Sequence, residues 1–434
     1  MLRFLYNLVW PLGLLFFLPR YLVKMFRRGG YRRKFAQRFG IYDDAVKQRL
    51  RNHRWIWLHA VSVGEVAIAL KLARAILEKE PDARFALTVT TTTGFAFAEK
   101  NASSEIEVMY TPLDFWPVMH RAFEIIRPER VILVEAEVWP NMVAETRSRN
   151  IPVALVNARL SPRSRGRFQR FRWVVAPMFR LLDVICVPDE ADIEAWADLG
   201  ARPNRIRHTG SIKFDPGPVV AGGGDPGRLN ASISSNIAGF NRPVLFGGST
   251  HPGEEAILAR VFLRLRSEFP QVLLFLAPRH VERAREVKRE MEKFSLGCSF
   301  TTEIEGKSNI ADDCLILDRT GELRSWYPIA TVVFVGKSLA VGGGQNPVEP
   351  IVAGKPVILG PRMSNFALLA RELISNDGAI EVTDEETLYA GAKRLLSDQN
   401  ARTRLVENGQ RVINVHRGAT ERTAELVLEM VKNK

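Results

Sequence analysis

Short apolar runs alternate along the chain with stretches in which apolar residues recur at every third or fourth position. Such runs indicate strands buried in a parallel sheet, and the periodic stretches indicate amphipathic helices. The first half contains the runs Trp55–Val61, Phe85–Thr90, Val108–Tyr110, Val131–Glu135, Pro152–Val156 and Val184–Val187. The second half contains Val244–Gly248, Gln271–Ala277, Leu315–Asp318, Thr331–Val335 and Val357–Leu359. Strands that alternate with helices predict an α/β fold with a parallel sheet in each half.

An acidic residue stands where the first apolar run gives way to a helical pattern. Val66, Leu70, Ala73 and Leu77 follow at steps of three and four residues, so Glu65 lies at the junction of a strand and a helix. Ligands of open α/β sheets bind at this edge. The helix dipole favours the ionised carboxylate, which makes Glu65 a candidate general base. The alternative is an ordinary Glu in the first turn of a helix.

The loops after other strands of the first half are polar where a plain connection would need only Gly or Pro. These loops are Thr90–Gly94, Glu135–Asn141 and Asn157–Ser161. Their composition is typical of a binding edge. Two interpretations of Glu137 stay open, because it can cap the helix that begins near Pro140 or line a site. Glu135 is interpreted as structural.

A stretch rich in proline and glycine divides the two halves and predicts an interdomain connection. At 434 residues the chain is long enough for two domains. The predicted division is an N-terminal segment 1–42, a first domain 43–214, a linker 215–242 and a second domain 243–434. Lys213 lies just before the linker. Two interpretations of Lys213 stay open, because it can be a surface charge or a residue of a binding site.

The beginning of the chain has the pattern of a membrane-associated segment. Residues 4–18 are apolar and uncharged, and eight basic residues follow from Arg20 to Arg38, with no acidic residue before Asp43. No small-residue cleavage site follows, which argues against a secretory signal. We expect a short anchor or an interfacial helix, with its basic flank against anionic lipid on the cytoplasmic side. The rest of the chain is expected to be soluble and cytoplasmic.

The charge of the chain points to an anionic partner. The composition, 46% hydrophobic and 25% charged, is that of a folded protein, and the net charge is +13. Residues 159–172 contain six arginines with two phenylalanines between them. Such a segment is typical of a nucleic-acid-binding surface or of a helix face exposed to solvent. Because the chain also begins with a membrane-associated segment, we favour contacts with lipid phosphates over nucleic acid.

Cysteine and acidic residues give no sign of a metal centre. Cys186, Cys298 and Cys314 lack metal-ligand spacing, which suggests buried thiols in a reducing compartment. The pairs Asp43-Asp44 and Asp312-Asp313 lack a third ligand, and no HExxH spacing occurs. We expect no metal and no other cofactor.

A glycine-rich stretch in the second half suggests a nucleotide site. Gly342–Gly344, followed by Asn346 and Pro347, is expected to offer backbone N–H donors to a phosphate at a helix start. Ser249-Thr250 and Thr320-Gly321 offer two further helix starts. Arg279 is suited to phosphate or base, and Glu322 and Glu349 to ribose hydroxyls. The late position of the glycines does not fit the GxGxxG pattern of a dehydrogenase.

Six motifs in this order carry a family resemblance. They are His59-Ala-Val-Ser-Val-Gly-Glu65, Val134-Glu-Ala-Glu-Val-Trp-Pro-Asn141, Asn157-Ala-Arg-Leu-Ser161, Gly210-Ser-Ile-Lys-Phe-Asp215, Pro278-Arg-His280 and Gly344-Gln-Asn-Pro-Val-Glu349. Together they resemble the bacterial lipid A Kdo transferases (3-deoxy-D-manno-oct-2-ulosonic acid transferases) over nearly the whole chain.

The resemblance implies a GT-B glycosyltransferase fold, in which two Rossmann-like domains face each other across a cleft and the last helix, about Thr420–Val431, packs back on the first domain. It implies inverting transfer of Kdo from CMP-Kdo to a lipid A precursor (lipid IVA), for lipopolysaccharide core biosynthesis at the cytoplasmic face of the inner membrane. Glu65 would be the base, Glu137 would support the transition state and Lys213 would stabilise the leaving group. The positions that would contact CMP are Pro278, Arg279, Thr320, Gly321, Glu322, Asn346, Pro347, Val348 and Glu349.

Two other functions stay open at this point. A membrane-associated GT-B transferase could use another nucleotide sugar, and binding of CMP but not UDP would separate the two. A membrane-tethered nucleic-acid-binding protein predicts salt-dependent binding of DNA or RNA and no sugar transfer.

Overall fold

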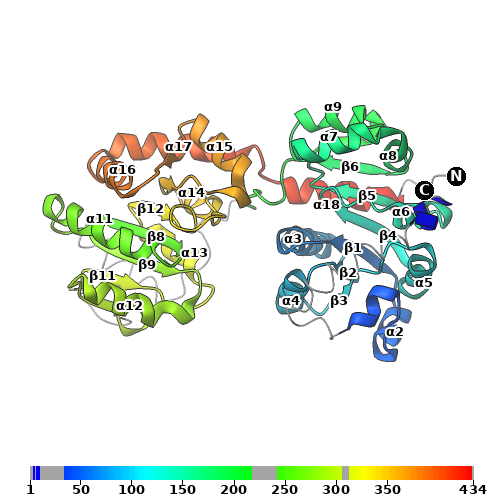
Figure 1. Cartoon of the computed structure of the whole chain (residues 1–434), viewed down its shortest axis with the longest axis horizontal. Coiled ribbons are helices and arrows are strands. Elements are labelled where there is room, and N and C mark those ends of the chain that lie inside the picture. Colours follow the sequence, from blue (N-terminus) through cyan, green and yellow to red (C-terminus); the bar gives the residue numbers. More distant parts are fainter. Residues whose placement is uncertain (1–2, 5, 10–33, 218–241, 305–311, 433–434) are drawn as a thin grey trace. The chain divides into compact units, whose positions relative to one another are not determined.

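The computed structural model describes residues 3–4, 6–9, 34–217, 242–304 and 312–432 (Figure 1). The chain divides into two compact units. The first comprises Met1–Asp215 and His416–Lys434, and the second comprises Pro216–Val415. Most of the predicted linker, residues 218–241, lies outside the described residues. Each unit is built around one seven-stranded sheet.

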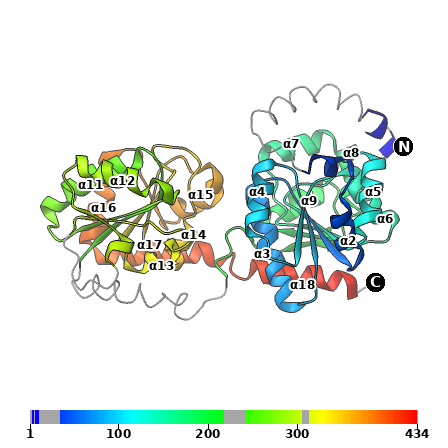
Figure 2. The ribbon, with the colours of Figure 1, turned by 90° about the horizontal axis from the view of Figure 1, so that it is seen from below.

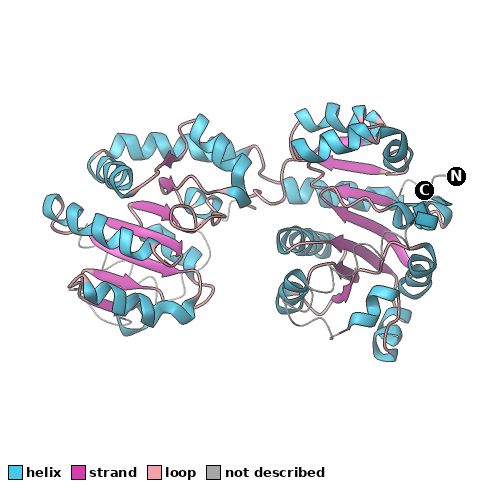
Figure 3. Cartoon of the chain, in the orientation of Figure 1, coloured by secondary structure: helices cyan, strands magenta, loops and turns pink. Residues whose placement is uncertain are grey.

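The sheet of the first unit is parallel throughout, with the strand order β3-β2-β1-β4-β5-β6-β7. Figure 3 draws the strands as magenta arrows between cyan helices. The strands of this sheet are β1 (Trp55–Ala60), β2 (Phe85–Val89), β3 (Ile106–Tyr110), β4 (Pro128–Val134), β5 (Val153–Val156), β6 (Val184–Val187) and β7 (Ile206–His208). This is the doubly wound order of Rossmann folds, in which the strand order reverses between β1 and β4. The carboxyl ends of those two strands therefore form the expected binding edge.

Helices cover both faces of this sheet. They are α2 (Asp44–Arg51), α3 (Val63–Lys79), α4 (Thr92–Asn101), α5 (Trp116–Ile126), α6 (Pro140–Ser148), α7 (Pro162–Arg170), α8 (Arg172–Phe179), α9 (Ala191–Asp198) and α18 (Ala419–Lys432), with short 3-10 turns η1 (Phe35–Phe39) and η2 (Pro203–Arg205). One core joins the sheet to α3, α4 and α18, and the other joins it to α2, α5 and α6. The last helix lies beside α3, where Val427 and Leu428 enter the first core (Figure 2).

The second unit repeats the pattern, with the parallel strand order β10-β11-β9-β8-β12-β13-β14. Its strands are β8 (Val244–Thr250), β9 (Leu273–Pro278), β10 (Cys298–Phe300), β11 (Cys314–Ile316), β12 (Val332–Val335), β13 (Val357–Leu359) and β14 (Ile380–Glu381). Its helices are α11 (Glu254–Glu268), α12 (Ala284–Lys293), α13 (Leu323–Trp326), α14 (Val348–Val352), α15 (Ala367–Ser375), α16 (Glu385–Ser397) and α17 (Gln399–Asn414), with 3-10 turns η3 (Val281–Arg283), η4 (Thr301–Ile304), η5 (Tyr327–Ile329) and η6 (Ser364–Phe366). Here β8 and β12 are the central neighbours.

Strands form at all of the predicted positions, with small differences at their ends. The sequence patterns did not predict β7, β10 and β14. Each has two or three residues, lies at an edge of its sheet and buries few of its side chains. In the sequence, a strand buried on both faces is recognised by a continuous run of apolar residues. These three short edge strands have no such run, so the sequence gives no sign of them.

The N-terminal segment contacts the first unit through polar groups. The Arg3 guanidinium donates hydrogen bonds to Asn141 Oδ1 at 3.0 Å and to Glu145 Oε1 at 2.5 Å, and Asn7 Oδ1 accepts the N–H of Trp116. Residues 10–33, which hold most of the expected anchor, lie outside the described residues. Among the residues that are described, no helix combines the length and the apolar character needed to cross a membrane.

The assignment of the whole basic flank to a lipid surface was wrong for its last residue. Arg38 is buried: its guanidinium donates to the carbonyl of Thr90 at 2.7 Å and stacks on the ring of Tyr110. Its neighbour Gln37 accepts the N–H of Tyr110. Both side chains satisfy polar groups at the ends of β2 and β3, so the folded unit begins before residue 43.

Candidate active site

Glu65 lies in the first turn of α3, directly after β1. Ser62 is the N-cap of the helix, and its side chain accepts the N–H of Glu65 while its hydroxyl donates to Glu65 Oε1 at 2.8 Å. The second carboxylate oxygen accepts the N–H of Val61 at 2.8 Å. These bonds fix the carboxylate at the carboxyl end of the central strand. Glu65 therefore does serve the start of the helix, as the simpler interpretation expected.

The Glu65 carboxyl group is also buried, and this changes its chemistry. Burial raises its pKa from 4.5 to about 7; hydrogen bonds from Val61 and Ser62 oppose the rise, and the charges of Glu135 and Glu137 add to it. The sequence argument expected the helix dipole to keep the group ionised, but desolvation outweighs that effect. A carboxyl group with a pKa near 7 is well matched to general-base catalysis at neutral pH.

Glu135 and Glu137 follow β4, the neighbour of β1 where the strand order reverses. Burial raises the pKa of both carboxyl groups, and repulsion from Glu135 raises that of Glu137 further. Glu135 also has a left-handed backbone, with φ of 60°, which is unusual for a residue other than glycine. Three acidic side chains therefore gather at one point of the sheet edge. The Glu-x-Glu spacing was the only sequence sign that Glu135 belongs with them.

The interpretation of Glu137 as a cap of α6 was wrong, because the carboxylate of Asp114 caps that helix. Asp114 Oδ2 accepts the N–H of Asn141 at 3.0 Å, and its Oδ1 accepts the N–H of Met142 at 2.9 Å. The N-cap residue of α6 is Trp139, whose side chain makes no cap bond. Glu137 is thus not needed to start α6 and is left for another role.

Lys213 joins this acidic cluster from the turn after β7. Burial lowers the pKa of its amine, the charge of Glu135 opposes this change, and the charge of Arg159 adds to it. In turn, the charge of the Lys213 amine lowers the pKa of Glu135 and so offsets part of the increase caused by burial. A cation among three buried carboxylates offsets part of their repulsion.

The turn that carries Lys213 is tied down on both sides. Asn157 Oδ1 accepts the N–H of Ile212 at 3.1 Å, and Lys71 Nζ donates to the carbonyl of Ile212 at 3.1 Å. The Asp215 carboxylate accepts the N–H of Thr420 at 2.9 Å, at the start of α18. The last helix therefore helps to hold the turn in place.

A second, basic cluster lies at the switch point of the other unit. His251 lies at its centre, and Lys337, His280, Arg283 and Arg279 surround it. Burial lowers the pKa of His251 to about 4, and the charges of these four residues contribute to the change. The ring of His251 lies 6.1 Å from that of His280 and contacts Gln345 Nε2 at 3.1 Å. Sequence reasoning treated Ser249-Thr250 as a helix start and did not single out His251, although it follows the central strand β8. This concentration of positive charge suits an anionic ligand.

The glycine-rich stretch does not present its N–H groups as predicted. The N–H of Gly343 donates to the carbonyl of Arg362 at 2.8 Å, and that of Gly344 to the carbonyl of Lys337 at 2.7 Å. Both glycines have positive φ, and a Cβ on Gly344 would lie 2.4 Å from the sulfur of Met363. The prediction that these two N–H groups bind phosphate was wrong, because they hold the loop in shape instead.

Comparison with known proteins identifies the family. Residues 33–216 match the family model for 3-deoxy-D-manno-octulosonic-acid transferase (kdotransferase). The 3-deoxy-D-manno-octulosonic acid transferase of Haemophilus influenzae is 31% identical over 92% of this chain and 91% of its own length. The chain belongs to this family. The Kdo transferase of Bordetella pertussis is 32% identical over 85% of this chain and 86% of its own. The protein is thus a glycosyltransferase of lipopolysaccharide biosynthesis.

Solved structures support the fold of this Kdo transferase. A glycosyltransferase from Rickettsia africae covers 88% of this chain and 100% of its own length, with a TM-score of 0.54 and 13% identity. At this identity the likeness speaks for the fold alone. It agrees with two parallel α/β units of the GT-B type.

The donor positions implied by the resemblance lie at the carboxyl ends of strands in the second unit. Pro278 ends β9, and Arg279 follows it, with its N–H donating to the carbonyl of Thr250. Thr320, Gly321 and Glu322 follow β11, and Asn346, Pro347, Val348 and Glu349 lead into α14 or begin it.

Electrostatics connect several of these positions. Burial raises the pKa of Glu349, while the charge of Arg324, a hydrogen bond from Asn346 and the charge of Arg279 oppose the rise. Asn346 Oδ1 also accepts the N–H of Val348 at 3.0 Å. Arg279 and Glu349 therefore lie close enough for their charges to interact, while their contact with CMP stays a prediction.

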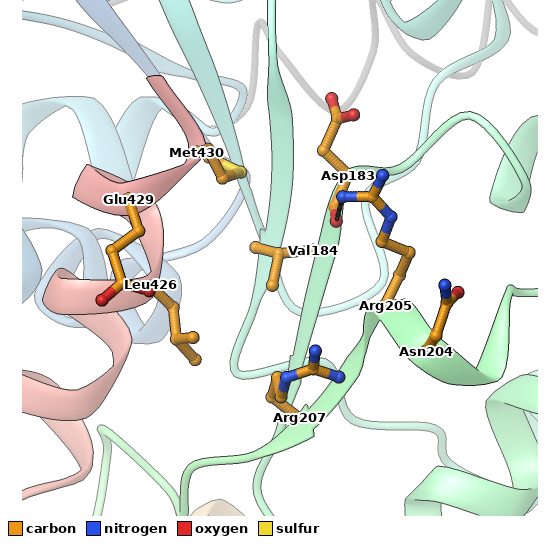
Figure 4. Close-up of a pocket in the computed structure, with 8 residues that line it drawn as sticks. All are labelled: Asp183, Val184, Asn204, Arg205, Arg207, Leu426, Glu429 and Met430. Atoms are coloured by element: carbon orange, nitrogen blue, oxygen red, sulfur yellow. Dashed lines mark hydrogen bonds between the residues drawn. The ribbon is translucent and has the colours of Figure 1, made fainter. Parts of the chain in front are cut away.

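A hollow of about 360 Å³ in the first unit lies away from these residues (Figure 4). Arg205, Arg207 and Asp183 line one side of it, and Glu429 of α18 faces them. It opens at the amino ends of β6 and β7, opposite the edge that carries Glu65. We do not assign it to the transfer reaction. Among the described residues, no group of three or more His, Cys, Asp or Glu side chains is arranged to hold a metal ion.

Proposed function

We propose that this Kdo transferase moves Kdo from CMP-Kdo to a lipid A precursor, lipid IVA, with inversion at the anomeric carbon. Membership of the family supports the transferred sugar. The observation that carries the mechanism is the buried carboxyl group of Glu65, with its pKa of about 7 beside Glu135 and Glu137. Such a group can take a proton from an acceptor hydroxyl at neutral pH.

In the proposed reaction, Glu65 removes the proton of the acceptor hydroxyl as its oxygen attacks the anomeric carbon. The bond to the CMP phosphate breaks on the opposite side, and the leaving phosphate keeps the electron pair. Direct displacement of this kind inverts the configuration and needs no covalent sugar–enzyme intermediate. The bonds from Val61 and Ser62 hold the base in place.

Three neighbouring charges are given supporting roles. Glu137 would stabilise positive charge that develops on the sugar ring, which is favourable for a carboxylate in a partly dry site. Lys213 would neutralise the departing phosphate. Glu135 would keep the Lys213 amine charged, since it opposes the effect of burial on that pKa.

The basic cluster of the second unit is proposed to hold the CMP part of the donor. Arg279 would pair with the phosphate, and Glu349 would accept from a ribose hydroxyl. Lys337 adds to the positive field there, whereas His251, whose pKa of about 4 leaves its ring neutral at pH 7, offers ring nitrogens for hydrogen bonds rather than charge. Because two glycine N–H groups are occupied within the loop, side chains rather than the glycine backbone would supply much of the phosphate contact.

We further propose that the protein works at the cytoplasmic face of the inner membrane, where its lipid acceptor lies. Arg3 and Asn7 bind the first unit, while Phe4, Leu8 and Val9 of the same helical segment are exposed. Polar contacts on one side and apolar side chains on the other suit a helix in a lipid interface.

The arginine-rich helices supply a second surface for the acceptor. Trp173, in α8, is 68% exposed. The charge of Arg159 lowers the pKa of Glu135, and the charge of Arg167, in α7, lowers that of Glu137, so both arginines lie near the acidic cluster. Arginines that border the acidic cluster are suited to the phosphates of a lipid A precursor. This placement favours the lipid over nucleic acid as the partner of segment 159–172.

Incubation of the protein with CMP-Kdo and a tetra-acylated lipid A precursor tests the proposal. Mass spectrometry should find the acceptor heavier by one or more Kdo residues, and released CMP. A matched incubation with a UDP-sugar should leave the acceptor unchanged. Transfer from the UDP-sugar alone would contradict the proposed donor.

The membrane role is tested with a chain that begins at Lys34 and so keeps the buried Gln37 and Arg38. The full chain should float with vesicles of phosphatidylethanolamine and phosphatidylglycerol, and the shortened chain should float much less while binding CMP equally well. Equal flotation of both would contradict an anchoring role for residues 1–33.

A further inference from the structure

Glu254 is a buried carboxylate that joins two loops of the second unit. It is the first residue of α11 and has no exposed surface. Its Oε2 accepts the N–H groups of His251 at 2.9 Å and Lys337 at 2.7 Å. Its Oε1 accepts those of Ser338 at 3.0 Å and Leu339 at 3.1 Å. Four backbone donors therefore converge on one side chain.

The two loops come from neighbouring strands at the centre of the sheet. One follows β8 and the other follows β12, between which the strand order reverses. They approach so closely that a Cβ on Gly336 would lie 2.3 Å from the carbonyl oxygen of Ser249. Lys337 has a left-handed backbone, with φ of 58°. A carboxylate that accepts four backbone N–H groups at a helix N-terminus is well suited to hold such a junction.

The segment that Glu254 holds also supports the glycine-rich stretch. The carbonyl of Lys337 accepts the N–H of Gly344, and the carbonyl of Ser338 accepts the N–H of Arg362. The N–H of Gln345 donates to the carbonyl of Gly336. Movement of residues 337–339 would therefore pass directly to the residues that precede Asn346.

We propose that Glu254 is a positioning residue for the nucleotide of the donor. It does not touch the ligand; it fixes His251 and Lys337 in the basic cluster before the ligand arrives. A loop that is already ordered loses less entropy on binding, so the affinity is higher. This role rests on the proposed function, in which the basic cluster holds CMP.

Glu255, the next residue, provides a matched control. It too is fully buried in α11, and its carboxylate pairs with the Arg283 guanidinium at 2.9 Å. The N–H groups of residues 337–339 donate to Glu254 and not to Glu255. Loss of charge at Glu255 should thus affect stability without loosening the loop.

Calorimetric titration with CMP compares the wild type, Glu254→Gln and Glu255→Gln. In Glu254→Gln an NH₂ group faces two N–H donors, so we expect CMP affinity to fall about tenfold or more, the usual effect of losing a charge-assisted bond. The KM for CMP-Kdo should rise with kcat at saturation little changed. Glu255→Gln frees the charge of Arg283 in the basic cluster, so its CMP affinity should not fall below that of the wild type, even if its melting temperature falls.

Wild-type affinity in Glu254→Gln would overturn the positioning role. A folded wild type that fails to bind CMP would overturn the proposed donor, and this role with it. Hydrogen exchange adds a test that does not require the variant to fold. The amides of residues 337–339 in the free wild type should be strongly protected; rapid exchange there would show that Glu254 does not hold the loop before CMP binds.

Discussion

Glu65→Gln should make the protein more stable at high pH and leave its stability unchanged at low pH. The glutamine has the shape of the protonated carboxyl group, so it can keep the bond from the Val61 N–H and remain beside Ser62. What it removes is the need to ionise a buried acid beside Glu135 and Glu137. An ordinary stabilising substitution would act equally at every pH.

The size and sign follow from the raised pKa. Below about pH 4.5 the Glu65 carboxyl group is protonated in both folded and unfolded chains. Between pH 4.5 and about 7 the unfolded chain loses this proton and the folded chain keeps it, so stability falls as pH rises; the loss is complete above pH 7. Because a tenfold change in an ionisation constant is worth about 1.4 kcal/mol, the advantage of glutamine should reach about 3 kcal/mol.

Denaturant unfolding from pH 4.5 to 9 measures this difference. Seven of the eight tryptophans precede residue 216, so fluorescence reports mainly on the first unit. Glu78→Gln is the control, because Glu78 is exposed near the other end of α3. The free-energy difference between Glu65→Gln and wild type should grow with pH, and that of the control should stay flat. A difference for Glu65→Gln that does not change with pH would refute the argument.

Three further predictions concern the two sites. Arg279→Ala and Glu349→Ala should each weaken CMP binding by about 1–3 kcal/mol with little change in the melting temperature without ligand, and unchanged calorimetric affinity in both would move the nucleotide site elsewhere. Asp114→Ala should lower the free energy of unfolding by about 1–2 kcal/mol in fluorescence-monitored denaturation, because α6 loses its cap; wild-type stability would contradict this reading. Lys213→Met should lower kcat by about 10²-fold while CMP affinity, measured by calorimetry, is kept, and a wild-type kcat would remove Lys213 from the mechanism.

The sequence predicted the sheets well because buried parallel strands leave continuous apolar runs. Trp55–Ala60 and Val184–Val187 could be located on that basis alone. The edge strand Cys298–Phe300 could not, since its side chains are only partly buried. The order of strands within each sheet also lies beyond a local pattern, because it depends on which runs pair with one another.

The site was predictable as a set of chemical groups but not as a geometry. Glu65 could be placed at the end of a strand, yet its raised pKa depends on burial and on neighbours about 70 residues away in sequence. Glu137 could not be separated from a helix cap until Asp114 was found to fill that role. Nothing in a short sequence window shows that the N–H of Gly344 is already bonded to Lys337.

The turnover of Glu65→Gln on saturating CMP-Kdo and lipid A precursor tests the central claim most directly. The variant should fold and bind CMP as the wild type does, while kcat falls by about 10²–10⁴-fold, the usual worth of a general base. Glu78→Gln, in the same helix, should turn over at the wild-type rate. A Glu65→Gln variant with wild-type kcat would contradict the assignment of Glu65 as the base.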